Sequence, residues 1–120
     1  MPDGVQIFGH DRDPGTRAAV RFFKERRFAI HQVDLTRKPI AAGELRRFVE
    51  RLGARTLLDE TSKAYRDAGL GYLRMDDAEI VTRLLAAPGL LRLPLVRFGN
   101  DVTVGRDEAT WKAWVRRSAS

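Results

Sequence analysis

The first third of the chain shows a strand, a helix and a second strand in succession, and this order restricts the fold more than any other feature of the sequence. Residues 5–8 form a short β-type run that ends at Gly9. Residues 14–28 place apolar side chains at helical spacing, and residues 29–35 again resemble a strand. If the two strands pair in parallel, their connection is a right-handed crossover. The sequence therefore predicts an α/β fold that begins with a β-α-β unit.

The junction between the first strand and the first helix carries a helix-start signal. Asp13 stands directly before Pro14. An aspartate side chain accepts hydrogen bonds from the free N–H groups at the start of a helix, and proline has a backbone angle suited to the first helical position. We therefore expect Asp13 to cap a helix that begins at Pro14.

The middle of the chain is predicted to be helical. Residues 41–52 have an amphipathic pattern and are followed by a glycine, a typical helix stop. Another helix is expected to begin at Asp76, which resembles a capping box together with Glu79, and to end before Pro88. A shorter helix is expected over residues 62–68. The apolar side chains that the two longer helices are expected to bury are Leu45, Phe48, Val49, Leu52, Ile80, Val81, Leu84 and Leu85.

The end of the chain returns to strands and closes with a helix. Residues 95–98 and 102–104 are short apolar runs on either side of residues 99–101, which suit a tight hairpin turn. Residues 107–117 are predicted to form the last helix. The aromatic side chains expected in the core, rather than in a platform that stacks nucleic-acid bases, are Phe22, Phe23, Trp111 and Trp114.

Length and residue types restrict the class of protein. A chain of 120 residues is expected to form a single domain over residues 1–120. It contains no cysteine, which excludes disulfides, thiolate metal sites and every mechanism that uses a thiol of the protein itself. No apolar stretch approaches the roughly 20 residues that cross a bilayer, and the first residues lack the pattern of a signal peptide. We therefore expect a cytoplasmic protein.

The formal net charge is +6, but the basic residues are scattered along the sequence, often near Asp or Glu. A scattered pattern is typical of a solvated surface, whereas a nucleic-acid footprint is a clustered stripe. From the sequence alone, nucleic acid is not an expected partner.

Several landmarks follow one another in the order of a known family. They are the segment 7–17, Arg37-Lys38-Pro39 before Glu44-Leu45, Leu52-Gly53, Leu57-Leu58, Tyr65, the segment 90–96 with Arg92 and Pro94, and Val104-Gly105-Arg106. Over roughly residues 5–115 the chain resembles the arsenate-reductase-like (ArsC/Spx) family. The resemblance implies a thioredoxin-like mixed sheet of about four strands, in the order β-α-β, helical insertion at about residues 41–88, and β-β-α.

The resemblance also shows where this chain departs from the family. Asp13 stands at the position of the family's catalytic cysteine, Thr16 at the Ser/Cys position three residues later, and Arg17 at the arginine that follows. Asp13 cannot form a mixed disulfide, and its negative charge opposes an oxyanion at the helix N-terminus. No catalytic residue is therefore expected. Capping is the leading interpretation of Asp13, with ligand binding as the alternative.

The family's anion-binding arginines are only partly present. Arg106 matches the Gly-Arg position, whereas Leu93 precedes Pro94 and Arg92 lies one residue earlier. Leu57-Leu58-Asp59 stands where true arsenate reductases have Leu-Leu-Arg. Arg92 and Arg106 are expected to form surface ion pairs, or alternatively to hold a phosphate or a carboxylate. The resemblance further implies that Pro94 follows a cis peptide bond, as in thioredoxin-like folds.

The candidate binding residues are thus Asp13, Thr16, Arg17, Arg92, Pro94 and Arg106. His10 and His31 each have an aspartate three residues on, but this spacing brings metal ligands together on a helix and neither pair is predicted to be helical. No metal and no cofactor are expected.

Two functional hypotheses follow. The first is a non-catalytic interaction or regulatory module, comparable with Spx-like proteins, which act through RNA polymerase. The second is an enzyme, arsenate-reductase-like or glutathione-dependent, or a protein that binds a small molecule or anion in the degenerate active-site cleft. The absence of cysteine favours the first hypothesis.

Overall fold

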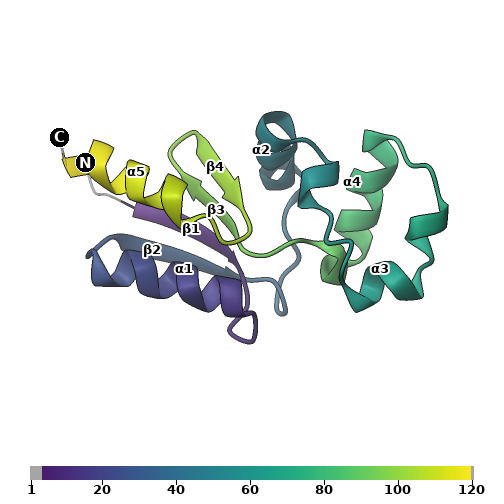
Figure 1. Ribbon diagram of the computed structural model, residues 1–120, viewed down its shortest axis with the longest axis horizontal. Helices are drawn as coiled ribbons and strands as arrows, with labels where there is room; N and C mark the ends of the chain where they lie inside the picture. The colour runs from purple at the N-terminus through teal and green to yellow at the C-terminus, as the bar shows by residue number, and fades with distance from the viewer. Residues whose placement is uncertain (1–3, 120) are drawn as a thin grey trace. The chain divides into compact units, whose positions relative to one another are not determined.

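The computed structural model describes residues 4–119, and the chain divides into two compact units (Figure 1). Unit 1 contains the described residues up to Lys38 and those from Leu93 onward, and unit 2 is Pro39–Arg92. The expectation of a single domain over residues 1–120 stays a prediction.

Unit 1 is a four-stranded mixed sheet with two helices. The strands are β1 (Gly4–Gly9), β2 (Ala29–Asp34), β3 (Leu95–Phe98) and β4 (Asp101–Val104), in the sheet order β2-β1-β3-β4. β1 and β2 are parallel, whereas β1 pairs with β3 and β3 with β4 in antiparallel fashion. The helices are α1 (Pro14–Glu25) and α5 (Glu108–Ala119). The predicted β-α-β start and the mixed sheet of about four strands are confirmed.

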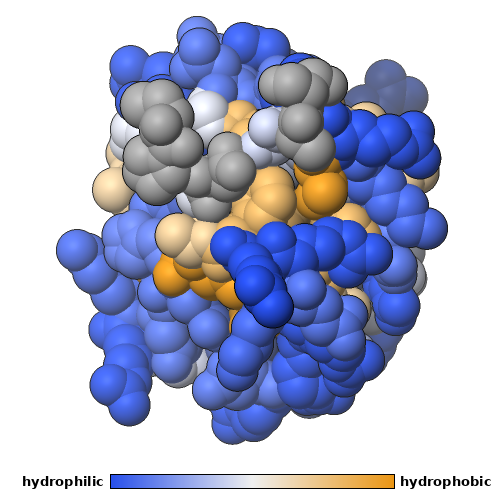
Figure 2. Space-filling model, turned by 90° about the vertical axis from the view of Figure 1, so that its left-hand side faces the viewer, coloured by the Kyte–Doolittle hydropathy of each residue, from blue (hydrophilic) through white to orange (hydrophobic). Residues whose placement is uncertain are grey.

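The two helices pack on one face of this sheet. Alternation along the strands places Val5, Ile7 and Val96 toward the helices, because successive side chains of a strand point to opposite faces. Trp111 is fully buried, and its indole N–H donates a hydrogen bond of 2.9 Å to the buried Thr103 hydroxyl. The aromatic side chains predicted for the core are all buried there: Phe22, Phe23, Trp111 and Trp114. In Figure 2 one face of the molecule is mostly hydrophilic, with hydrophobic residues near its centre.

α1 ends earlier than the predicted range of residues 14–28. It stops at Glu25, and Arg27 has a left-handed backbone with φ of 61°. The chain then turns so that the ring of Phe28 packs in a tilted arrangement with its centroid 5.5 Å from that of Phe23 and 5.8 Å from that of Phe98. Phe28 extends the apolar pattern of the helix in the sequence because its side chain packs against the same core. In the structure it reaches that core from a position beyond the end of α1.

The hairpin between β3 and β4 is tighter than predicted. Phe98 pairs with Asp101, so the turn contains only Gly99 and Asn100, and β4 begins at Asp101. A two-residue loop is the commonest hairpin connection, and Gly99 supplies the positive φ of 63°.

Unit 2 is helical, as predicted. It contains α2 (Ala42–Leu52), α3 (Lys63–Asp67) and α4 (Asp77–Ala86), together with three short 3-10 helices that were not predicted from the sequence. These are η1 (Arg55–Leu57), η2 (Leu70–Tyr72) and η3 (Pro88–Leu90).

The buried faces of the two longer helices of unit 2 match the predicted pattern in part. Leu45, Phe48, Ile80 and Leu84 are buried, whereas the other predicted positions are half-buried. Asp76 accepts a hydrogen bond of 2.8 Å from the Glu79 N–H and caps α4. Among the described residues, no helix has both the length and the apolar character needed to cross a membrane. A cytoplasmic location stays a prediction.

Candidate functional site

The site predicted by the sequence lies at the β1–α1 junction of unit 1, where a buried threonine supports the start of the helix. Thr16 is fully buried in the first turn of α1. It lies against Gly9, the last residue of β1: a Cβ atom on Gly9 would come within 2.1 Å of the Thr16 Oγ1 atom. Glycine is therefore required at this position, and the strand can approach the helix closely.

Asp13 caps α1, as predicted. Its Oδ2 atom accepts two hydrogen bonds from Thr16, one of 2.7 Å from the backbone N–H and one of 2.8 Å from the hydroxyl. Its own N–H donates to the His10 carbonyl at 3.1 Å, which closes the loop before the helix. The Asp13 carboxylate thus satisfies an N–H group that a helix start would otherwise leave without a partner, and its charge favours the positive end of the helix dipole.

Pro94 lies beside this capped helix start. The Leu93–Pro94 peptide bond is cis, as predicted. A Cβ atom on Gly15 would lie 3.0 Å from the Pro94 Cδ atom and 3.1 Å from the Leu93 carbonyl oxygen, so the first turn of α1 is in close contact with the Leu93–Pro94 segment. The Pro94 carbonyl in turn accepts a hydrogen bond of 2.9 Å from Gly105. Asp13, Thr16 and Pro94 are therefore neighbours in unit 1.

The three candidate arginines are not gathered around Asp13 by any contact in the described structure. Arg106 is exposed and its guanidinium pairs with Glu108 at 2.7 Å, which confirms the expected surface ion pair. Arg17 donates a hydrogen bond of 2.8 Å to the Asp11 carbonyl. Arg92 belongs to unit 2; its side chain is exposed and its N–H donates to the Leu57 carbonyl at 2.8 Å.

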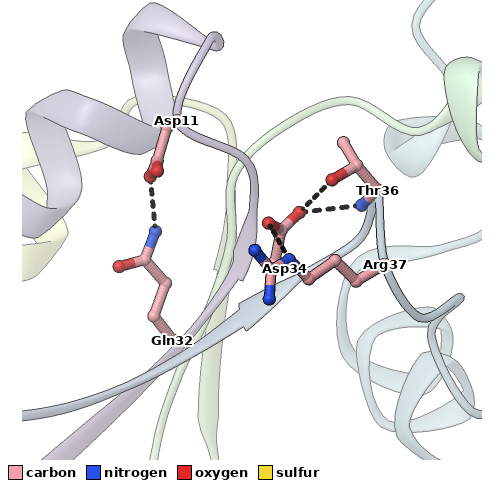
Figure 3. A network of polar contacts seen from close by, with 5 residues as sticks. All are labelled: Asp11, Gln32, Asp34, Thr36 and Arg37. Carbon is pink, nitrogen blue, oxygen red and sulfur yellow. Dashed lines mark hydrogen bonds and ion pairs between the residues drawn. The ribbon is translucent and has the colours of Figure 1, made fainter.

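A second polar cluster, absent from the sequence prediction, lies where β1 and β2 end (Figure 3). The Asp34 Oδ1 atom accepts hydrogen bonds from the Thr36 hydroxyl at 2.6 Å and from the Thr36 N–H at 2.9 Å. The Arg37 Nε atom forms an ion pair with the Asp34 Oδ2 atom at 3.7 Å. The Thr36 hydroxyl bond, followed by the Thr36 N–H bond and the charges of Arg37 and His10, lowers the pKa of Asp34. The Asp-x-Thr spacing is a turn signal that could have predicted these bonds.

The loop after β1 is linked to β2 through side chains as well. The Gln32 amide donates a hydrogen bond of 3.1 Å to Asp11, as Figure 3 shows. His10 is half-buried and its Nδ1 atom, shielded from solvent, has no hydrogen-bond partner within residues 4–119. His31 is exposed on β2, 3.4 Å from the Gln6 amide. Within the described part of the chain, no group of three or more His, Asp or Glu side chains is arranged to hold a metal ion.

Chemically, this arrangement is a helix start capped by a carboxylate. Asp13 uses one oxygen to hold Thr16, and its negative charge lies at the point where an incoming anion would need free N–H donors. Arg106 follows Gly105, whose N–H bonds the Pro94 carbonyl, and its guanidinium is paired with the Glu108 carboxylate.

The comparisons with known proteins point to one family. The ArsC family model matches residues 15–114, beginning two residues after Asp13. The arsenate reductases of Neisseria meningitidis serogroups A and B are each 28% identical to this chain over 109 residues, covering 88% of the chain and 92% of the relative.

Solved structures give the same result for the fold. The YffB protein superposes with a TM-score of 0.85 at 20% identity, covering 92% of this chain and 98% of that one. The arsenate reductase from Vibrio cholerae superposes with a TM-score of 0.81 at 18% identity, covering 92% and 96%. The mixed sheet of unit 1 is thus a thioredoxin-like sheet of the kind found in arsenate reductases, and the chain belongs to the ArsC family.

Proposed function

We propose that this chain is a non-catalytic ArsC-family protein that works as an interaction or regulatory module without thiol reductase activity. One observation carries the proposal: in a sequence with no cysteine, Asp13 caps α1 at the position that the family resemblance assigns to the catalytic thiol. The two hydrogen bonds between Asp13 and Thr16 give this residue a structural role of its own.

The chemistry of reduction explains why this substitution matters. Reduction of an arsenic oxyanion by a protein thiol begins with attack of the thiolate on arsenic, and the sulfur is oxidised when the bond is later broken by a second thiol. A carboxylate oxygen can act as a nucleophile, but it cannot undergo the two-electron oxidation by which two thiols become a disulfide. Asp13 can bind a proton or accept a hydrogen bond, but it cannot supply the reducing electrons.

The alternative, an enzyme or anion-binding protein that uses the degenerate cleft, has less support. Its two candidate arginines in unit 1 have other partners: Arg106 pairs with Glu108 at 2.7 Å, and Arg17 donates a hydrogen bond of 2.8 Å to the Asp11 carbonyl. Its other group at the helix start, Asp13, carries the wrong charge for an anion.

An interaction role has support from the surface of unit 2. Tyr72 and Leu73, next to each other at the end of η2, are 95% and 46% exposed. Large apolar side chains that are adjacent and exposed are typical of contact surfaces, where aromatic residues are enriched. RNA polymerase, the partner suggested by the Spx resemblance, stays a hypothesis.

A reductase assay tests the first half of the proposal. The purified chain is incubated with arsenate, glutathione and glutaredoxin, and arsenite is measured, with the Neisseria meningitidis arsenate reductase as the positive control. We expect no arsenite above the protein-free background. Arsenite formation by the cysteine-free chain would contradict the proposal.

Affinity purification from the native host tests the second half. We expect the tagged chain to retain a specific protein that the variant Tyr72→Ser/Leu73→Ser loses, while Lys63→Ser/Arg66→Ser, changed at exposed polar positions of the neighbouring α3, keeps it. The eluates are also probed for RNA polymerase subunits. Identical protein profiles for all three chains would count against a contact surface at Tyr72.

A further inference from the structure

The positive charge of the chain is unevenly divided between the two units. Most of the net charge of +6 lies in unit 1, whereas basic and acidic residues nearly balance in unit 2. The sequence alone shows scattered basic residues because it does not show which of them share a surface. The fold of unit 1 gathers several of them.

α1 and α5 both point cations away from the sheet. In α1, Arg17, Arg21 and Lys24 are exposed and follow one another at spacings of four and three residues, so they share one side of the helix, opposite the buried Phe22 and Phe23. In α5, Lys112 and Arg116 are exposed at a spacing of four, opposite the buried Trp111 and Trp114. We call these five residues the basic face: Arg17, Arg21, Lys24, Lys112 and Arg116.

The two helices that carry the basic face are direct neighbours. The ring centroids of Phe22 and Trp111 are 5.6 Å apart, and those of Phe23 and Trp114 are 6.5 Å apart. Since both helices cover the same face of the sheet and bury these rings between themselves and the strands, their exposed sides both face away from the sheet on the same side of unit 1.

The acidic residues of the two helices do not neutralise this surface. Glu25 pairs with Arg26 at 3.9 Å, at the end of α1, and Glu108 pairs with Arg106 at 2.7 Å, at the start of α5. Neither pair involves a residue of the basic face. Glu25 and Glu108 nevertheless lie one helical turn from Arg21 and Lys112, so the five cations outnumber two acidic side chains at the ends of these helices.

Placing like charges one helical turn apart is unfavourable for a helix. Arg17 with Arg21 and Lys112 with Arg116 are such pairs. Unit 2 contains both kinds of pair: Lys63 pairs with Asp67 along α3 and Arg47 with Glu44 along α2, while Arg47 and Arg51 of α2 are like charges one turn apart.

The residue types indicate what this surface binds. Besides its cations, the outward side of α5 holds the exposed Ala109 and Ala113, while the aromatic residues of both helices are buried. A protein interface would need aromatic or large apolar anchors, and a membrane surface would need apolar side chains that insert. Contact with a phosphate backbone needs only cations on an accessible convex surface.

We infer that the basic face binds the phosphate backbone of duplex nucleic acid without reading its sequence. The surface offers neither exposed aromatic rings for stacking on unpaired bases nor amide side chains for base edges, so the contacts are electrostatic. The inference rests on the proposed function in one respect: it supplies a partner for the proposed interaction module. It does not depend on the cleft at Asp13.

Binding to labelled duplex DNA, followed by fluorescence anisotropy, tests the inference. We expect two duplexes of unrelated sequence to bind with equal affinity, with a slope of log K against log salt of about −4.5 if all five cations contact phosphates. The variant Arg21→Glu/Lys24→Glu should lose at least about tenfold in affinity, because removal of two contacts and addition of two repulsive charges act together.

The matched control is Arg46→Glu/Arg74→Glu, which changes the net charge equally through two exposed residues of unit 2. It should keep more than half of the wild-type affinity. Lys112→Glu on α5 is a second test of the face, used if circular dichroism shows that the α1 variant is unfolded. Equal losses in the α1 variant and the control would overturn the inference.

Two further outcomes would also overturn it. One is the absence of wild-type binding at low salt. The other is stronger binding to poly-glutamate or to vesicles of anionic phospholipid than to the duplex. The reductase assay above has no bearing on these results, so the inference and the proposed loss of reductase activity can fail separately.

Discussion

A carboxylate at the start of α1 can replace a thiolate in structure but not in chemistry. Both groups accept hydrogen bonds from N–H donors at a helix start and both are favoured by the helix dipole. Asp13 shows this in its two hydrogen bonds to Thr16. Only a thiolate can be oxidised to a disulfide, so under the proposed function this position keeps its local structure without supporting the reaction.

Removal of the Asp13 carboxylate should weaken the fold. In Asp13→Ala the Thr16 N–H and hydroxyl lose their shared acceptor, and we expect the free energy of unfolding in urea to fall by about 1 kcal/mol. Asp13→Asn, which keeps an acceptor oxygen, should lose less. Glu50→Ala, at an exposed position within α2, serves as the control and should change the free energy by less than about 0.5 kcal/mol. An alanine variant as stable as the wild type would contradict the capping role.

The Asp34 carboxyl should titrate at unusually low pH. The Thr36 hydroxyl bond and the other nearby groups lower its pKa below the ordinary value of 3.8, so the folded chain binds this proton more weakly than the unfolded chain. The stabilising contribution is therefore present above pH 3.8 and is lost as the pH falls through the folded-state pKa.

The matching measurement is an NMR titration of the Asp34 carboxyl carbon. Thr36→Ala removes the hydroxyl donor and should raise the pKa of Asp34 toward its ordinary value. Thr61→Ala removes the same kind of bond from Asp59 in unit 2 and should leave the Asp34 titration unchanged. No difference between the wild type and Thr36→Ala would contradict this account.

Residue roles set by local spacing could be predicted from the sequence, and those set by neighbours distant in sequence could not. The Asp13 cap depends on residues within one helical turn. The contact of Gly15 with Pro94 joins segments far apart in the chain, and only the family resemblance suggested it. The roles of Asp13, Thr16, Arg17, Arg92, Pro94 and Arg106 in binding stay predictions.

At the scale of elements, the order along the chain was predictable because each helix and strand has its own periodicity. The boundaries were less so. α1 ends at Glu25 because Phe28 is needed against Phe23 and Phe98, a requirement of packing that periodicity does not show. The 3-10 helices of unit 2 were missed because a single turn is too short to repeat an apolar pattern.

The start of α1 should still activate a thiol if one is supplied. In Asp13→Cys the new side chain lies at the N-cap of a helix, where the dipole and the free N–H groups favour a thiolate. We expect its pKa to fall below about 8.5, the ordinary value for cysteine, as measured by the ultraviolet absorbance of the thiolate.

Asn100→Cys, in the exposed β3–β4 turn, is the control for this thiol and should titrate near the ordinary value. Equal pKa values for the two thiols would show that the helix start has lost its electrostatic effect. Comparing the two thiol pKa values distinguishes two cases. In one the helix start lacks only a nucleophile, and in the other it has also lost its positive electrostatic potential.

At the scale of the whole molecule, the fold decides which charges meet. The same basic residues that look scattered in the sequence lie on the same side of unit 1 once α1 and α5 lie side by side. The sequence indicated the sign and size of the net charge, but not its concentration in unit 1, because that depends on contacts between the two ends of the chain.

The aromatic residues provide a test of the single-domain prediction. Both tryptophans, Trp111 and Trp114, are buried in unit 1, so tryptophan fluorescence reports on that unit alone. Far-ultraviolet circular dichroism follows the helices of both units. A single domain predicts that the two signals change at the same urea concentration, since cooperative unfolding gives coincident transitions. Separate transitions would show that the units unfold independently.

Arg27 suggests a route to a more stable chain. Its φ of 61° is a conformation that glycine adopts freely, whereas other L-residues are disfavoured there by about 1–2 kcal/mol. Arg27→Gly should therefore raise the free energy of unfolding by part of that amount. The greater freedom of glycine in the unfolded chain offsets the rest. A protein engineer seeking heat resistance would begin at this position, which lies outside both the helix start and the basic face.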